Sequence, residues 1–173
     1  MRITVSGLPG SGTTTLAEAL SSRFDLGHVS SGDVFRSMAD ERGVSLAEFG
    51  RIAEEDPEID REIDERQREI ARERDDVVVE GRLSGWMVED ATLRVWLAAP
   101  VDVRAERVAD REEKGFEEAL DEVEEREESE AKRYREIHGI DIGDLSVYDL
   151  VVDTSTWDKE GVAAVATTAA RSL

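Results

Sequence analysis

A segment near the N-terminus of this 173-residue chain restricts its fold more than any other: Gly7-Leu8-Pro9-Gly10-Ser11-Gly12-Thr13-Thr14-Thr15. It follows the strand-like run 3–6 and precedes a helical pattern that extends to about residue 23. Glycines let successive N–H groups turn toward one point, and a helix N-terminus carries a partial positive charge. A strand, a glycine-rich loop and a helix in this order predict a phosphate-binding loop, and we expect all nine residues to contact ATP.

The loop departs from the general pattern, Gly-x-x-x-x-Gly-Lys-[Ser/Thr], because Thr13 occupies the lysine position. Thr14 can still place a hydroxyl on the Mg²⁺ that accompanies ATP, but the positive charge beside the β- and γ-phosphates is missing. A bare glycine-rich turn is the simpler interpretation, and the flanking strand and helix argue against it. An inactive nucleotide-binding module stays open. An active kinase would need arginines from elsewhere.

The rest of the chain alternates short apolar runs with long charged stretches, which is typical of an α/β fold with a parallel sheet. The Val-rich runs predict strands that are covered on both faces. We expect them at residues 3–6, 28–29, 77–80, 93–97 and 148–152. We expect helices at residues 12–23, from about 31, from 45, from 57, and at 101–114, 116–135 and 158–170.

Two polar regions, at about 43–74 and 110–142, are inserted between strands. Long insertions at the phosphate-loop end of a parallel sheet are candidates for substrate-binding and lid segments. We therefore expect one domain over residues 1–173. Its core comprises 1–30, 77–109 and 143–173, its monophosphate-binding arm 31–76, and its lid 110–142.

The charge of the chain limits its partners. Forty-two acidic and 22 basic residues give a formal net charge of −20, which argues against nucleic acid as a partner. Only three of the bases are lysines. Solvated helix faces would explain the acids, but the size of the excess favours adaptation to concentrated salt. With no cysteine, no bilayer-length apolar run and no signal-peptide pattern, we expect a cytosolic protein that meets no membrane. Separately, we expect it to be a monomer.

The acceptor side is predicted from residues that follow the second and third strands, because ligands bind outside the carboxyl ends of strands in open α/β sheets. Ser31 and Gly32 can cap a helix and donate to a phosphate, and Arg36 lies one turn further. Gly81 and Arg82 follow the third strand, and Arg82 is the strongest candidate for holding the acceptor's phosphate.

Glu80 and Trp86 lie close in sequence to Gly81 and Arg82, and each allows two interpretations. Glu80 could organise Mg²⁺ through water or orient Arg82. Trp86 could stack on a base or pack against the insertion.

Arginines of the second insertion could replace the missing lysine, because guanidinium groups suit bidentate phosphate contacts. Arg107 and Arg111 lie four residues apart on the helix that enters it. Arg126 and Arg133 lie seven apart, on one face of the next helix, and are the better candidates for catalytic residues. Pairing with a neighbouring glutamate is the simpler interpretation for most arginines of this chain.

The chain resembles the archaeal-type cytidylate kinases, which belong to the nucleoside monophosphate kinases with a phosphate loop, and the resemblance spans essentially its whole length. Four stretches carry it: Gly7 to Thr15 with its Gly-Thr-Thr-Thr ending, Glu80-Gly81-Arg82-Leu83-Ser84-Gly85-Trp86-Met87, Arg126-Glu127-Glu128-Ser129-Glu130 with Lys132-Arg133-Tyr134, and Asp141-Ile142-Gly143-Asp144-Leu145-Ser146-Val147-Tyr148-Asp149-Leu150. On this resemblance Thr13 is a trait of the branch. The resemblance also implies strand order 2-3-1-4-5 and an arm and lid.

The resemblance further implies transfer of a phosphoryl group from ATP, with Mg²⁺, to CMP and dCMP. Bacterial cytidylate kinases have elements similar to Ser31-Gly32-Asp33-Val34-Phe35-Arg36 and to Gly81-Arg82, whose arginines hold the CMP phosphate. This implies the same role for Arg36 and Arg82, and transition-state roles for Arg126 and Arg133. A kinase for another nucleotide or small metabolite stays open, whereas a GTPase is disfavoured because no Asn-Lys-x-Asp motif occurs.

Overall fold

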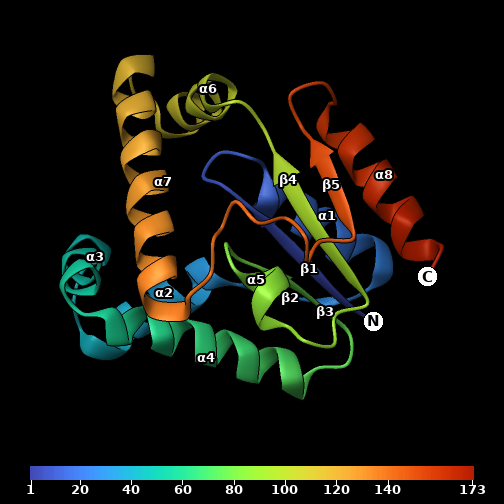
Figure 1. Cartoon of the computed structure of the whole chain (residues 1–173), viewed down its shortest axis with the longest axis horizontal. Helices are drawn as coiled ribbons and strands as arrows, with labels where there is room; N and C mark the ends of the chain where they lie inside the picture. The colour runs from blue at the N-terminus through green and yellow to red at the C-terminus, as the bar shows by residue number, and fades with distance from the viewer.

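A five-stranded parallel sheet forms the centre of the molecule, with strand order β2-β3-β1-β4-β5 (Figure 1). The computed structural model describes the backbone of residues 1–173 and all side chains except those of residues 46, 47, 50 and 54. The strands are β1 (Arg2–Gly7), β2 (Gly27–Ser30), β3 (Val77–Glu80), β4 (Leu93–Ala98) and β5 (Leu150–Asp153). The expected α/β class and strand order are confirmed, although β5 begins two residues later than predicted.

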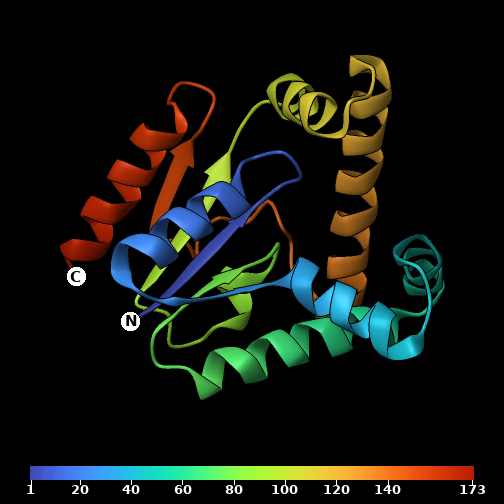
Figure 2. The ribbon, with the colours of Figure 1, turned by 180° about the vertical axis from the view of Figure 1, so that it is seen from behind.

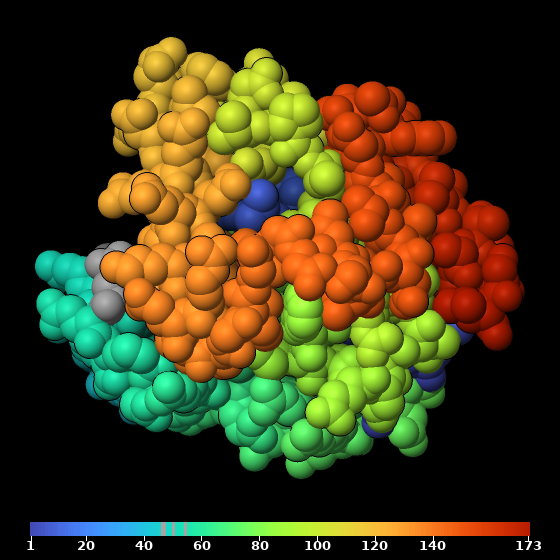
Figure 3. Space-filling model, viewed as in Figure 1, coloured from blue at the N-terminus to red at the C-terminus, as the bar shows by residue number. Residues whose placement is uncertain are grey.

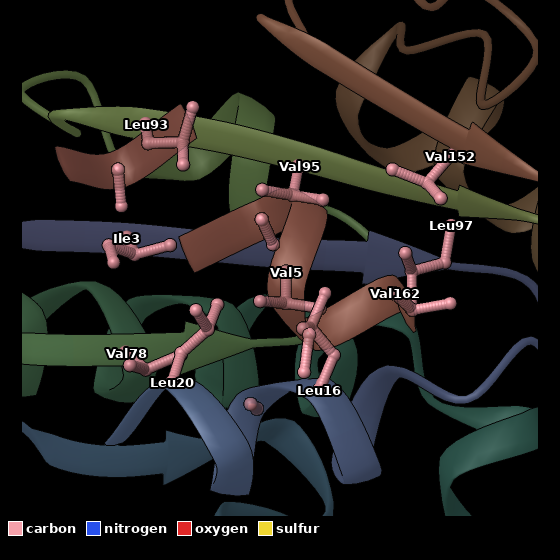
Figure 4. Close-up of a cluster of buried hydrophobic side chains, with 14 of the residues drawn as sticks. Ile3, Val5, Leu16, Leu20, Val78, Leu93, Val95, Leu97, Val152 and Val162 are labelled. Atoms are coloured by element: carbon pink, nitrogen blue, oxygen red, sulfur yellow. The ribbon is translucent and has the colours of Figure 1, made fainter. Parts of the chain in front are cut away.

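One face of the sheet is covered by α1 (Thr13–Phe24) and α8 (Lys159–Arg171), which lie in front of the strands in Figure 2. Alternate strand residues such as Ile3, Val5 and Val95 point into this layer and are fully buried, as the two-residue period of a strand requires. Leu16 and Leu20 of α1 pack onto them (Figure 4). This apolar layer fixes the helix that follows the phosphate loop against the sheet.

The opposite face carries the short helix α5 (Ser84–Met87) and the segment before β5. Trp96, Ile142 and Tyr148 form a buried cluster there, and the rings of Trp96 and Tyr148 lie 5.2 Å apart. Tyr148 was predicted to open the fifth strand. It lies outside β5 because its ring packs over Trp96 and Gly85, where a Cβ on the glycine would lie 2.3 Å from the tyrosine ring.

The expected monophosphate-binding arm consists of α2 (Ser31–Arg42), α3 (Leu46–Glu55) and α4 (Pro57–Glu73). Each begins at a side-chain cap: Ser30 accepts from the Asp33 N–H, Ser45 from Glu48 and Asp56 from Glu58. A small apolar core that includes Met38 joins the three helices.

The predicted lid, residues 110–142, contains the end of α6 (Val101–Glu112) and all of α7 (Phe116–His138), and the two helices pack together through Val108 and Val123. The helix α7 is three residues longer than predicted, because its end is set by Gly139 in the left-handed region. None of the helices that the structure describes combines the length and apolar character needed to cross a bilayer.

Candidate active site

The phosphate loop has the backbone geometry that the glycines predict. Gly10 and Gly12 have φ values of 82° and 96°, in the left-handed region that favours glycine. A Cβ on Gly10 would also lie 2.6 Å from the carbonyl oxygen of Arg104. Gly12 is the N-cap residue just before α1, and no side chain among the described residues caps that helix. The first N–H groups of α1 therefore stay available to an anion.

Glu80, at the end of β3, connects the loop to the neighbouring strands. The hydroxyls of Thr13 and Thr14 donate to its Oε1, at 2.8 and 2.7 Å, and Nε2 of His28 lies 3.3 Å from its Oε2. Burial alone would raise the pKa of Glu80, but the hydrogen bonds from His28, Thr14 and Thr13 outweigh it and lower that pKa. Thr13 thus contacts an ionised carboxylate at the position where other phosphate loops have lysine.

The Glu80–His28 pair should make stability depend on pH. The hydrogen bond to Glu80 raises the pKa of His28 against the effect of burial, and Asp33 and Glu18 add to the rise. The contribution of the His28–Glu80 pair to the stability of the fold is therefore fully present below about pH 6.5. It is lost as the pH rises through the higher pKa that His28 has in the folded state.

We expect His28→Gln to cost about 1 kcal/mol of unfolding free energy at pH 6 and little at pH 8.5. Urea unfolding across this range at constant KCl measures the difference. A cost for His28→Gln that is the same at pH 6 and at pH 8.5 would contradict the prediction.

The loop forms the floor of a cleft of about 1390 Å³ at the carboxyl ends of the strands. In Figure 3 the cleft opens between α6, α7 and the segment before β5, with atoms of the N-terminal region at its floor. Its basic lining residues are Arg36, Arg82, Arg107, Arg111, Arg126, Arg133 and Lys159. The cleft has as many basic as acidic lining residues, whereas the whole chain has almost twice as many acids as bases. The cleft is therefore less negative than the chain as a whole, which favours the binding of phosphate.

Arg82 lies between the loop and the lid. Its Nε donates to Oε2 of Glu130 at 2.8 Å, its NH1 donates to the carbonyl of Gly7 at 3.2 Å, and its side chain is only 19% exposed. Gly81 does not line the cleft. It is buried beside Gln67, and a Cβ at this position would lie 3.1 Å from the Gln67 side chain. The structure thus brings Arg82 to the predicted place and gives Gly81 a packing role.

The other predicted acceptor residues, Ser31, Gly32 and Arg36, line the same cleft. Arg36 is exposed and pairs with Asp33, one turn earlier on α2. Gly7 and Leu8 were expected to contact ATP but do not line the cleft; Gly7 is buried at the end of β1, and its contribution is the carbonyl that accepts from Arg82. Residues 9–15 do line it.

The candidate lid arginines both face the cleft but have different partners. Arg126 is 43% exposed and lies 3.8 Å from Glu130. Arg133 donates to Oδ2 of Asp60 on α4 at 2.8 Å, which joins the lid to the arm. Within the described residues, the buried Nε–H of Arg133 has no acceptor. A buried donor without a partner suits an anionic ligand.

Two arginines of α6 hold the loop from the side. Arg107 donates to Thr154 at 2.8 Å and to the Gly10 carbonyl at 3.3 Å. Arg104 was not among the residues predicted from the sequence. It is 3% exposed, donates to the Pro9 carbonyl at 3.2 Å and pairs with Glu127 at 2.7 Å. Its i, i+3 spacing from Arg107 is the only sequence signal that could have indicated it.

Other cleft residues were also missed, and one prediction needs correction. Trp157 and Lys159 follow β5, so the rule that ligands bind at strand ends could have found them. Asp60 and Asp64 come from α4, where the sequence was read only for its apolar face. Trp86 packs with the Trp96 cluster and does not line the cleft, so its proposed stacking on a base is wrong and the packing alternative holds.

The Thr14 hydroxyl and the Glu80 carboxylate suit Mg²⁺, because both are oxygen ligands at the cleft floor. No cluster of three metal-binding side chains occurs in the part of the chain that the structure describes. A magnesium ion bound here would therefore take most of its ligands from phosphates and water, as it commonly does in kinases.

A parallel sheet of this order, a glycine-rich loop before α1 and an arginine-lined cleft define a phosphate-loop kinase. Solved structures of the same fold include the shikimate kinase from Aquifex aeolicus, with a TM-score of 0.62 and 21% identity over 98% of this chain and 96% of that one. A gluconokinase from Sinorhizobium meliloti has a TM-score of 0.62 and 16% identity over 98% of this chain and 91% of that one.

Sequence comparison narrows the class. The profile of the cytidylate kinase-like family matches residues 2–156, and the chain belongs to this family. It is 58% identical to the cytidylate kinase of Pyrococcus abyssi, over 94% of this chain and 90% of the relative. The cytidylate kinase of Methanococcoides burtonii is 56% identical over 92% and 90%, and that of Haloarcula marismortui 54% identical over 95% and 86%.

Proposed function

We propose that this protein transfers a phosphoryl group from ATP to CMP, giving ADP and CDP, and that it also accepts dCMP. The observation that carries the proposal is the single cleft that joins a phosphate loop to acceptor-side arginines, in a chain more than half identical to cytidylate kinases over nearly its whole length. The Thr13 substitution does not oppose it, because six arginines line the same cleft.

In this proposal the phosphates of ATP lie on the loop, where the N–H groups of residues 10–15 and the N-terminus of α1 receive them. Mg²⁺ held near Thr14 and Glu80 would neutralise charge between the β- and γ-phosphates. Glu80 orients Thr13 and Thr14, whose hydroxyls already donate to it. Arg107, between Gly10 and Thr154, keeps the loop in place.

The acceptor phosphate is held by Arg36 and Arg82, with Ser31 and Gly32 beside it and Gly81 setting the position of Arg82. The attacking oxygen of a nucleoside monophosphate already carries negative charge, so the site needs no strong general base. Catalysis then consists of holding two phosphates in line and neutralising the charge between them.

Arg126 and Arg133 supply the charge that Thr13 lacks. The five N–H donors of a guanidinium allow Arg133 to keep its bond to Asp60 and still donate to the transferring group. Closure of the lid, residues 110–142, over the loop would exclude water and limit hydrolysis of ATP.

A direct assay tests the proposal. The purified protein in concentrated KCl is given ATP, Mg²⁺ and one acceptor at a time: CMP, dCMP, UMP, AMP or GMP. Rapid formation of CDP and dCDP is the expected result. Turnover with a different acceptor would reassign the substrate. Binding of ATP without turnover on any of the five would identify a non-catalytic nucleotide-binding module.

We also propose that the protein is adapted to concentrated salt, on the ground of its net charge of −20 and its three lysines. Repulsion between surface carboxylates extends over a Debye length of about 10 Å at 0.1 M salt and about 3 Å at 1 M. Raising KCl from 0.1 to 2 M should therefore raise the melting temperature by about 10 °C or more, because screening removes this repulsion. Full stability and activity in dilute buffer would contradict this proposal.

A further inference from the structure

One face of α4 lines the cleft through Asp60, Ile63, Asp64 and Gln67, whose spacing places them on one side of the helix. Gln67 marks the end nearest the sheet, because its Nε2 donates to the Glu80 carbonyl at 2.6 Å. Asp60 lies seven residues earlier, which is about 10 Å along the helix axis. It therefore lines the cleft about two helical turns away from the contact between α4 and the end of β3.

This position assigns Asp60 to the nucleoside part of an acceptor. A carboxylate repels a phosphate, and the acceptor phosphate belongs beside Arg82, next to the loop. Apolar side chains accompany Asp60: Ile63 is one turn away on α4, and Phe35 of α2 lines the same cleft. A slot with apolar walls and a carboxylate at its edge suits a flat ring that presents a hydrogen-bond donor.

The carboxylate of Asp60 has one protein donor, which binds one of its two oxygens. Its side chain is 13% exposed, and its Oδ2 accepts from NH1 of Arg133 at 2.8 Å. Burial raises the pKa of Asp60, and the charge of Arg133 acts against that rise. Among the residues that the structure describes, no group donates to Oδ1. An ionised carboxylate oxygen can accept more than one hydrogen bond, so Oδ1 can accept from a donor on a ligand in the cleft.

We propose that Asp60 selects the acceptor's base by accepting a hydrogen bond from the exocyclic amine of cytosine, and so rejects uracil. Cytosine presents an N–H donor at the position where uracil presents a carbonyl oxygen, which a carboxylate repels. Arg133 holds the carboxylate in place and favours its charged form. The inference rests on the proposed transfer to CMP and adds to it the residue that distinguishes the two pyrimidines.

The Asp60→Asn variant tests the inference, because an amide can either accept or donate. We expect its kcat/KM for CMP to fall roughly 10- to 100-fold, and the CMP-to-UMP ratio of kcat/KM to fall by at least as much. Asp60 could instead serve only to tie the lid to the arm through Arg133. In that case Asp60→Asn would lower turnover of CMP and UMP by the same factor and leave the ratio unchanged, which would overturn the inference.

Two further measurements complete the test. Glu58→Gln makes the same acid-to-amide change on the same helix, at a 72% exposed side chain outside the cleft, and should leave the ratio unchanged. A CMP analogue without the exocyclic amine, assayed on the unaltered protein, should lose roughly 10- to 100-fold in kcat/KM, and it tests the inference even if Asp60→Asn does not fold. Equal use of CMP, UMP and the analogue by the unaltered protein would refute the inference, while absence of any CMP turnover would refute the proposed function itself.

Discussion

Replacing Arg82 with alanine should lower kcat/KM for CMP by about 1,000-fold, the largest loss we expect from any single change in the cleft. Arg82 is the arginine that contacts both halves of the site, through the carbonyl of Gly7 in the loop and the carboxylate of Glu130 in the lid. On the proposed mechanism, the acceptor phosphate would lose its main bidentate partner and would no longer be held in line with ATP. Steady-state kinetics with varied CMP should show both a higher KM and a lower kcat.

The Arg82 experiment needs a control for folding, because the change leaves the largely buried Glu130 with only the more distant Arg126 as partner. The double variant Arg82→Ala/Glu130→Gln removes that unpaired charge and should regain stability without regaining activity. Arg72→Ala, at a 61% exposed side chain of α4 outside the cleft, is the matched arginine change and should remain fully active. A rate with Arg82→Ala close to that of the unaltered protein would remove Arg82 from the mechanism.

The conformation of the loop and the position of Arg82 in the cleft could be predicted from the sequence, because both depend on the local order of residues along the chain. The φ values of Gly10 and Gly12 follow from residue type, and the position of Arg82 follows from its place after a buried parallel strand. The same rule was not applied to the residues after β5, so Trp157 and Lys159 were missed for lack of a motif, although their location was predictable.

Contacts between helices from separate insertions could not be predicted in this way. The pairing of Arg133 with Asp60 depends on how α7 packs against α4, and these residues lie 73 positions apart. The buried position of Arg104 likewise depends on the approach of α6 to the loop. Periodicity gives the face of a helix but not its neighbour, so in a chain this rich in arginine and glutamate many pairings are equally compatible with the sequence.

Replacing Glu80 with glutamine should lower kcat by about 100-fold with little change in KM for CMP. The amide has nearly the shape of the carboxylate, and its oxygen can still accept from Thr13 and Thr14. What the variant loses is the negative charge beside the Thr14 hydroxyl, where we place the Mg²⁺ that accompanies ATP. The Mg²⁺ concentration needed for half-maximal rate should therefore rise, and a titration of rate against Mg²⁺ at fixed ATP measures it.

The Glu80 prediction also decides what Thr13 contributes. If the loop depends on an ionised Glu80 to hold two threonine hydroxyls, a threonine at position 13 is a working part of this site, and its charge deficit is met by arginines across the cleft. Glu69→Gln, at an exposed side chain of α4, should leave both kcat and the Mg²⁺ requirement unchanged. An unchanged Mg²⁺ requirement in Glu80→Gln together with a lower kcat would instead mean that Glu80 acts only by positioning the loop, and the metal would have to be placed on Thr14 and the phosphates alone.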